Sequence, residues 1–390
     1  MKQVIDVADR LGEVKEYYFS IKLKQLAEMR REGVNVINMG IGSPDMAPHK
    51  GVLDTLNQTS TDAGNHAYQS YSGIPELRRA FANWYSAYFG VKLNPDTEIL
   101  PLIGSKEGIM HIAMTYLQEG DEVLLPNPGY PTYRSASKLT GARLRDYDLK
   151  EENNWLPDLD KLEAAGLDKV KIMWVNYPHM PTGSKGSATF FEKLIALAKK
   201  YHFLIVNDNP YAFVLNDEPM SILSIPGAKE VALELNSLSK SHNMAGWRVG
   251  MVAGDEHYIK NVLRFKSNMD SGMFKPVQLA AVKALSLSKE WYNHLNEQYR
   301  KRRKIIFELA DIIGCSYDEN QVGLFVWAKV PKAYKDGYSL SDEILDRTGV
   351  FITPGGVFGS AGNQYIRFSL CNDIKILEEA KIRIGKPVCR

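Results

Sequence analysis

Short apolar runs alternate with longer amphipathic segments over the first two thirds of the chain. Runs of this length and composition are typical of buried strands. They occupy residues 34–39, 99–103, 122–126, 171–176, 203–208 and 231–235. Pro101 interrupts the second run and weakens the strand prediction there, because proline cannot donate to a strand ladder. The alternation predicts an α/β fold with a mostly parallel sheet.

The amphipathic segments between these runs predict helices. They cover residues 14–31, 75–88, 109–117 and 189–200. Pro75 suits the first position of its helix, where a missing N–H is tolerated. The apolar side of the first segment consists of Tyr18, Ile21, Leu23, Leu26, Ala27 and Met29. We expect this first helix to pack against the protein and to have no further role.

Beyond residue 255 the pattern changes. Helical segments dominate residues 256–313, with a break near 272–276. Two apolar strands are predicted at 324–328 and 365–370, and a last helix at 373–384. Alternating α/β thus gives way to α+β, which predicts a second, smaller domain that begins near residue 285.

Composition and charge exclude several classes of protein. The 390 residues are 44% hydrophobic and 24% charged, as in ordinary globular proteins, and the formal charge of +2 gives no reason to expect nucleic acid or an anionic membrane as partner. The three cysteines form no metal-binding spacing and no paired framework, so we expect a cytoplasmic protein and no metal site. We also expect no signal peptide and no membrane span.

Lys240 is the first candidate for chemistry. It lies among small hydroxylated residues directly after the run 231–235. A lysine at such a strand end can have a lowered pKa and act as a nucleophile toward carbonyls. Ser237, Ser239 and Arg248 are donors of the kind that surround a phosphate, so together they suggest a phosphate-bearing aldehyde cofactor. Taken alone, Lys240 fits a surface lysine in a serine-rich loop better than a cofactor lysine, and only the residues at the other strand ends reverse this interpretation.

Other strand ends carry compatible residues. Ser105 follows one strand in a Gly/Ser turn that opens a helix, an arrangement that points N–H groups at a phosphate. Tyr130 and Asn176 follow two further strands, and Asp208 ends a fourth. A buried acid requires a cationic partner. Ligand sites of open α/β sheets lie beyond the carboxyl ends of the strands, so these residues and Lys240 predict a single site.

Arg367 lies inside an apolar strand, between Ile366 and Phe368. An arginine in that position needs an anion. A substrate carboxylate gripped by both guanidinium nitrogens is one interpretation, and a structural ion pair is the other.

These segments, in the same order from Gly40 to Leu370, resemble the class I and II family of pyridoxal-phosphate aminotransferases, of fold type I. The stretch from Ser237 to Gly250 matches the cofactor-lysine signature of that family, which is a specific motif. The resemblance implies a large cofactor domain, whose mostly parallel sheet is flanked by helices, and a smaller α+β domain. The predicted parts are an N-terminal arm that packs with the small domain (1–45), the large domain (46–285) and the small domain (286–390).

The resemblance also implies roles for the residues at the strand ends. Lys240 would form a Schiff base with pyridoxal phosphate and later move a proton. Asp208 would pair with the pyridinium nitrogen and keep the ring an electron sink, and Tyr211 would donate to the phenolic oxygen of the ring. Tyr130 would stack on the ring face. The residues implied to hold the phosphate are Ser105, Lys106, Ser237, Ser239 and Arg248.

Two further features follow from the same resemblance. Arg367 looks like the arginine that binds the substrate α-carboxylate, and Gly42 lies where the N-terminal segment closes over that site. Tyr68 resembles the tyrosine that reaches the phosphate of a neighbouring subunit. The resemblance therefore implies a homodimer with shared sites.

The chain departs from the family pattern at Met180. The family usually has Asn-Pro-Thr-Gly where this chain has the segment 180–183, which begins with methionine. That asparagine normally donates to the ring oxygen and supports the substrate carboxylate, whereas methionine cannot donate a hydrogen bond. The loss of one such bond costs about 1–3 kcal/mol. Our hypothesis is that Asn176, His179 or a water molecule takes over the contact.

The implied reaction is a ping-pong transamination through pyridoxamine phosphate. The segment 266–276 looks like the subgroup that acts on alanine, methionine and similar neutral amino acids, with 2-oxoglutarate as acceptor. It resembles the diaminopimelate aminotransferases less closely. The alternatives are therefore a diaminopimelate-type aminotransferase, a lyase or synthase of the same fold and, least favoured, a cofactor-binding regulator without turnover.

Overall fold

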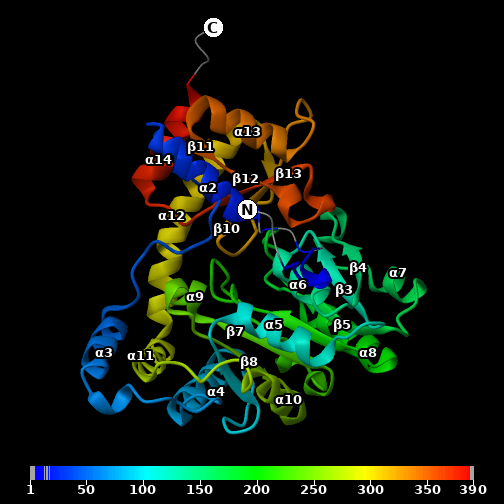
Figure 1. The fold of residues 1–390 in the computed structure, drawn as a ribbon. Coiled ribbons are helices and arrows are strands. Elements are labelled where there is room, and N and C mark those ends of the chain that lie inside the picture. Colours follow the sequence, from blue (N-terminus) through cyan, green and yellow to red (C-terminus); the bar gives the residue numbers. More distant parts are fainter. Residues whose placement is uncertain (1–4, 13, 15, 17, 387–390) are drawn as a thin grey trace.

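The computed structural model of this protein describes residues 5–12, 14, 16 and 18–386, and its ribbon is drawn in Figure 1. The predicted helix at 14–31 falls partly outside these residues, and so does the predicted N-terminal arm. Cys389 also lies outside them. No helix within the described part of the chain is long and apolar enough to cross a membrane.

A seven-stranded sheet organises the larger part of the molecule, in the order β2-β8-β7-β6-β5-β3-β4. Its strands are β2 (Ile99–Leu102), β3 (Glu122–Asn127), β4 (Arg143–Asp148), β5 (Val170–Val175), β6 (Leu204–Asp208), β7 (Ala232–Ser237) and β8 (Gly250–Gly254). All neighbours from β7 to β4 pair in parallel, and β8 runs antiparallel to β7 and β2. The predicted mostly parallel sheet is confirmed.

Two strands of this sheet were not predicted from the apolar pattern. β4 (Arg143–Asp148) is an edge strand that is mostly exposed and charged, so it shows no apolar run. β8 (Gly250–Gly254) is short and begins and ends with glycine. Pro101 is tolerated in β2 because that strand is the opposite edge and pairs only with β8.

Helices cover both faces of the large sheet. α4 (Pro75–Phe89), α8 (Ala188–Tyr201) and α11 (Lys275–Leu285) supply side chains to the core on one face. α5 (Ser105–Tyr116), α6 (Pro131–Lys138) and α10 (Glu256–Lys266) supply the core on the other face. The result is a helix–sheet–helix sandwich, which leaves the carboxyl ends of the strands free to carry a site.

The second part of the molecule contains a four-stranded antiparallel sheet in the order β12-β13-β10-β9. Its strands are β9 (Ser316–Tyr317), β10 (Phe325–Lys329), β12 (Thr353–Pro354) and β13 (Tyr365–Ser369). Around it lie α12 (Lys289–Ile313), α13 (Gly337–Thr348) and α14 (Ile374–Gly385). The predicted strands and last helix are confirmed, whereas α13 was not predicted. The remaining helices are α1 (Asp9–Gly12), α2 (Tyr18–Arg31), α3 (Lys50–Ser60), α7 (Leu159–Ala164) and α9 (Leu238–Ser241).

The long helix α12 links the two cores, as Figure 1 shows. Tyr292 near its start belongs to the core of the large sheet, and Leu295, one turn later, belongs to the core of the small sheet. The predicted boundary near residue 285 coincides with the end of α11, just before α12. The division into domains itself stays a prediction.

The N-terminal segment packs on the second sheet. β1 (Ile37–Asn38) pairs in parallel with β11 (Val350–Phe351), and Phe19 of α2 joins the core around β10 and β13. β1 is much shorter than the strand predicted at 34–39.

The predicted apolar side of α2 is wrong in part. Ile21 is 52% exposed and Leu23 is 42% exposed, while Phe19, Lys22 and Leu26 are buried. The buried Lys22 is accommodated because its ammonium forms an ion pair with Asp342 at 3.4 Å. The apolar stripe thus faces in a direction that the pattern of α2 alone did not indicate.

Candidate active site

A cavity of about 580 Å³ lies at the carboxyl ends of the large-sheet strands and is also lined by residues of the small sheet. It is lined by most of the residues that the sequence indicated as site residues. They are Gly42, Ser105, Lys106, Tyr130, Asn176, Asp208, Tyr211, Ser237, Ser239, Lys240, Arg248 and Arg367. Residues far apart in the chain meet in this one cavity; Ser105 and Arg367, for example, are separated by 262 positions.

Lys240 sits in α9, directly after the end of β7. Its Nζ donates a hydrogen bond to the carbonyl oxygen of Gly42 at 2.6 Å. Burial lowers the pKa of the Lys240 ammonium below its ordinary range. A larger share of neutral amine is thereby available at neutral pH than for a surface lysine, as a nucleophile requires.

Asp208 ends β6 and is buried. Burial raises the pKa of this carboxyl to about 7, while the hydroxyl of Tyr133 and the charge of Lys240 act in the opposite direction. Tyr133 donates to Oδ2 at 2.9 Å. Oδ1 is buried and has no hydrogen-bond partner among the described residues. A buried carboxylate oxygen left in this way fits a protonated ring nitrogen of a cofactor.

A cradle for an anion is built around the start of α5. Gly104 precedes α5 with φ +83°, and a Cβ at that position would overlap the guanidinium of Arg248. Arg248 in turn donates to Ser239 Oγ at 3.5 Å, and Ser239 shares a 2.8 Å hydrogen bond with Ser237. Burial and the charge of Arg248 lower the pKa of Lys106. Two neighbouring cations and a helix N-terminus fit a phosphate group.

Tyr130 and Tyr211 line the cavity from different strand ends. Tyr211 is buried, and burial raises the pKa of its phenol, so it remains a hydrogen-bond donor at neutral pH. Tyr130 precedes α6, and its ring meets the ring of Tyr133 edge-on at 5.5 Å. The stacking of Tyr130 on a cofactor ring stays a prediction.

Arg367 lies in β13 and is buried. Its guanidinium donates to the carbonyl oxygen of Gly40 at 2.6 Å and to Met180 Sδ at 3.3 Å. The ring centroid of Phe325 lies 3.9 Å from the guanidinium carbon, and that of Phe358 lies at 4.6 Å. These carbonyl, thioether and aromatic contacts hold the guanidinium in place, but each of them binds it less strongly than a carboxylate would.

Asn176 and His179 differ in their relation to the cavity. Asn176 lines it, donates to the carbonyl oxygen of Asp208 and accepts from the amide of Met180. An amide nitrogen carries two hydrogens, so one remains for a ligand. His179 is not among the lining residues; its Nδ1 meets Thr182 Oγ1 at 2.8 Å, and burial lowers the pKa of the ring to about 3. Of the two side chains in our hypothesis, only Asn176 is in position.

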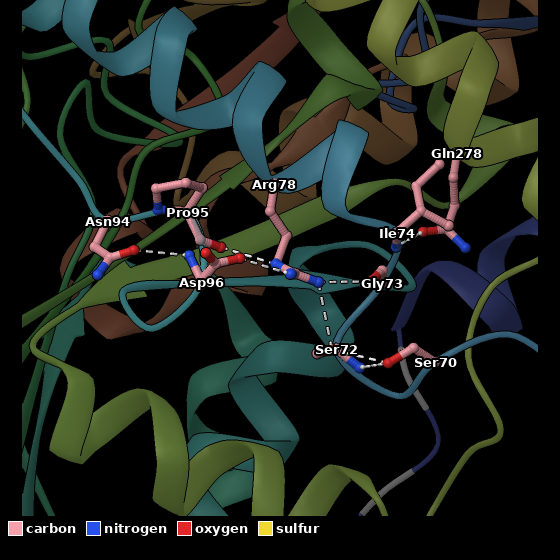
Figure 2. A network of polar contacts seen from close by, with 9 residues as sticks. All are labelled: Ser70, Ser72, Gly73, Ile74, Arg78, Asn94, Pro95, Asp96 and Gln278. Atoms are coloured by element: carbon pink, nitrogen blue, oxygen red, sulfur yellow. Dashed lines mark hydrogen bonds and ion pairs between the residues drawn. The ribbon is translucent and has the colours of Figure 1, made fainter.

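Tyr68 does not line the cavity of its own chain and is 91% exposed. The loop that carries it is nevertheless held firmly, as Figure 2 shows for its end at residues 70–74. Arg78 donates to Gly73 O and to Pro95 O, each at 2.8 Å, and Gln278 accepts from the amide of Ile74 at 2.8 Å. A fixed loop thus presents an exposed tyrosine to solvent.

Several lining residues were missed by sequence reasoning. α2 contributes Phe19, Ser20 and Leu23, although we expected this helix only to pack. Partial exposure of an apolar side chain beside a cavity is a property of the folded protein, and the pattern of a single helix does not reveal it. Other lining residues that sequence reasoning missed include Ile41, Tyr133, Phe325 and Phe358.

A second cluster of ionisable residues lies outside the cavity. Side-chain ligand atoms of Glu107, His111 and Asp270 lie within 4.8 Å of one another. The ammonium of Lys266, which is buried, bonds to Asp270 at 2.7 Å and supplies a cation there. An ion-paired network accounts for this cluster.

Known proteins similar to this chain agree with the geometry. The family described as aminotransferase class I and II matches residues 34–381. A protein of Dehalococcoides mccartyi named LL-diaminopimelate aminotransferase is 43% identical over 93% of this chain and 94% of its own. One of the same name from Aquifex aeolicus is 39% identical over 98% and 99%.

Solved structures show the same architecture. Apo-BacF of Bacillus subtilis superposes with a TM-score of 0.94 at 34% identity, covering 98% of both chains. A probable N-succinyldiaminopimelate aminotransferase of Thermus thermophilus gives a TM-score of 0.87 at 32% identity, covering 94% of this chain and 99% of its own.

Proposed function

Because this chain belongs to the class I and II aminotransferase family, we propose that it transfers the amino group of an L-amino acid to a 2-oxo acid in two half-reactions. It is a pyridoxal-phosphate-dependent aminotransferase of fold type I. When bound, pyridoxal phosphate supplies an electron sink for the pair of electrons left at the substrate Cα.

One observation carries this proposal. A partly buried lysine, a buried aspartate with one oxygen that has no hydrogen-bond partner among the described residues, a two-cation anion cradle and a buried arginine line the same cavity. Their chemistry corresponds to a phosphate-bearing aromatic cofactor and to a substrate carboxylate.

Each of these residues has a separate role in the proposed reaction. Arg367 binds the α-carboxylate and so orients the Cα–H bond toward Lys240. Lys240 Nζ removes the Cα proton and keeps it for return, which its lowered pKa favours. Asp208 Oδ1 would accept a hydrogen bond from the protonated ring nitrogen of the cofactor, and Tyr211 would donate to its ring oxygen.

The phosphate of the cofactor would be held at the N-terminus of α5. The N–H groups that follow Gly104, the side chains of Ser239 and Arg248, and the ammonium of Lys106 would surround it. Ser105 and Ser237 complete the cradle. Gly42 and the backbone around it cover the substrate side of the cavity.

LL-diaminopimelate is the first candidate for the amino donor. Several relatives that are 39–43% identical over nearly the whole chain carry the name LL-diaminopimelate aminotransferase. This donor has a distal ammonium and a distal carboxylate, which need polar partners.

A neutral donor, similar to alanine or methionine, is the second candidate. Phe19, Leu23, Ile41, Phe325 and Phe358 form an apolar wall of the cavity. The charged lining residues of the described chain all have a role at the cofactor or at the α-carboxylate. An apolar wall favours an apolar side chain, because desolvation of a distal charge would be uncompensated there.

A panel of donors tests the proposal. Each L-amino acid is mixed with 2-oxoglutarate, and both the specificity constant and the loss of the visible band of the bound cofactor are measured. Preference for LL-diaminopimelate over methionine by more than tenfold selects the first candidate, and the reverse selects the second. Release of pyruvate with ammonia from a donor without any 2-oxo acid would contradict transamination and favour a lyase.

A homodimer is part of the proposal. Tyr68 is exposed and precedes the anchored residues Gly73 and Ile74, and Tyr71, Met269 and Phe274 are also exposed apolar side chains. The loops that carry them touch, because a Cβ at Gly272 would lie 2.8 Å from Gln69 O. A second copy that covers this surface would receive Tyr68 at its phosphate cradle.

We further propose a cytoplasmic location. Cys315 and Cys371 are both buried and form no disulfide in the described part of the chain. Reduced cysteines are typical of proteins kept in a reducing compartment.

A further inference from the structure

Tyr133 touches the acid that holds the cofactor ring, although no motif indicated it. It lies in the first turn of α6 and is 1% exposed. Its hydroxyl donates to Asp208 Oδ2 at 2.9 Å, across a separation of 75 residues in the sequence. The other oxygen, Oδ1, is left for a ligand.

Packing fixes the Tyr133 ring. It stacks on the indole of Trp174 in β5, with centroids 5.2 Å apart and ring planes 7° apart. Tyr130 covers its edge. Burial raises the pKa of the Tyr133 phenol well above its ordinary range, so the hydroxyl keeps its proton and donates.

On the basis of the proposed function, we infer that Tyr133 is a positioning residue that orients Asp208 and keeps its Oδ1 directed at the ring nitrogen of the cofactor. A carboxylate held through one oxygen can rotate only by breaking that bond. Asn176 holds the backbone of the same residue, because its amide donates to Asp208 O. The side chain and the main chain of Asp208 are thus fixed by different partners.

The bond also affects the charge of Asp208. Burial raises the pKa of this carboxyl to about 7, and the Tyr133 hydroxyl lowers it. Without the hydroxyl, a larger share of Asp208 is protonated at neutral pH. A protonated acid no longer attracts a ring N–H, so cofactor binding and ring protonation both weaken.

Tyr133→Phe tests this inference, and Tyr147→Phe is the matched control. Tyr147 is also a buried tyrosine; it donates to the backbone oxygen of Trp174 and does not line the cavity. Each variant loses one buried hydroxyl beside the same tryptophan, and each keeps its ring. Only Tyr133→Phe removes a donor from Asp208.

Three quantities are measured on the full-length variants: the dissociation constant of pyridoxal phosphate, the pH titration of the visible band of the bound cofactor, and kcat with KM. We expect Tyr133→Phe to raise the dissociation constant about tenfold and to lower kcat about tenfold, the scale of one hydrogen bond to a charged group. KM for the amino donor should stay within about twofold, since Arg367 is untouched. The band should titrate at a different pH in Tyr133→Phe and at the wild-type pH in Tyr147→Phe.

A double variant checks that Tyr133 acts through Asp208. When Asp208→Asn is already present, adding Tyr133→Phe should cause no further loss of cofactor affinity. Equal behaviour of Tyr133→Phe and Tyr147→Phe, or fully additive losses in the double variant, would overturn the inference. Failure of the wild-type protein to bind pyridoxal phosphate would instead contradict the proposed function.

Discussion

At the scale of single residues, the buried ionisable groups determine how the stability of the cofactor-free protein responds to pH. The pKa of Asp208 is raised from 3.8 to about 7 by burial. Between these two values the unfolded chain releases a proton that the folded chain retains. The folded, cofactor-free protein therefore loses stability as pH rises through this window.

Asp208→Asn removes that dependence. We expect the cofactor-free wild type to melt at a lower temperature at pH 8 than at pH 5, with a contribution from Asp208 of at most about 3 kcal/mol between these two pH values. The variant should show a smaller difference between the two pH values. Melting curves of both apo proteins check this, and an unchanged pH dependence would show that Asp208 is already ionised in the empty cavity.

Met180 is the residue at which the chain departs from its family. Its thioether accepts from Arg367 across 187 residues of sequence, and its amide donates to Asn176. The position thus has structural contacts of its own.

Met180→Asn tests whether a contact to the cofactor is missing. Because Asn176 lines the cavity with a second N–H hydrogen available, we expect the variant to change kcat by less than about threefold. Steady-state kinetics with one donor and 2-oxoglutarate measure it. A gain above tenfold would show that nothing in the present chain replaces the family asparagine.

At the scale of secondary-structure elements, the turn before α5 is constrained by the anion cradle. Gly104 has φ +83°, and a Cβ at this position would overlap the guanidinium of Arg248. An alanine there must displace the arginine, and with it one cation of the anion cradle.

Gly104→Ala should raise the dissociation constant of pyridoxal phosphate more than about tenfold, since a charge-assisted contact is lost. Gly90→Ala is the control: it also has a positive φ, +66°, but a Cβ there meets no described atom within 4 Å. That control should cost only about 1 kcal/mol of stability and leave cofactor affinity unchanged. Titration of the two apo variants with cofactor measures their dissociation constants. Equal affinities would place the phosphate elsewhere.

The helix α2 shows how an element can have two roles. Phe19 packs into the core of the small sheet and also lines the cavity, while Leu23 lines the cavity with 42% of its surface exposed. The pattern of α2 predicted a helix correctly. Its orientation depends on what packs beside it, namely Phe358 and the residues around Asp342.

At the scale of the whole molecule, the proposed homodimer can be tested by complementation. If Tyr68 serves the partner's site, a dimer of one Lys240→Ala chain and one Tyr68→Ala chain contains one intact site. Co-expression with two different tags allows this mixed dimer to be isolated.

Under random pairing, the mixture should reach about one quarter of the wild-type activity at limiting pyridoxal phosphate, because half of the dimers carry one intact site of two. Each parent alone should be much less active. Activity of the mixture no higher than the mean of the two parents would show that Tyr68 acts within its own chain or not at all. Light scattering gives the oligomeric state of the mixture and of the isolated mixed dimer.

Much of the secondary structure and many candidate site residues of this protein were determined by local sequence. Most of the buried strands, the helices at 75–89 and 188–201 and the candidate residues at five strand ends could be predicted, because they depend on the order of apolar and polar residues within one segment. The short, glycine-bounded β8 is buried but could not be predicted in this way. Lys240 and Asp208 became candidates for one site through the rule that strand ends of one sheet share an edge.

Only the tertiary structure decided the rest. The bond from Tyr133 to Asp208, the thioether contact to Arg367 and the apolar wall from α2 join residues far apart in the chain. Such contacts depend on how helices and sheets pack in three dimensions, and no periodicity within one segment encodes them.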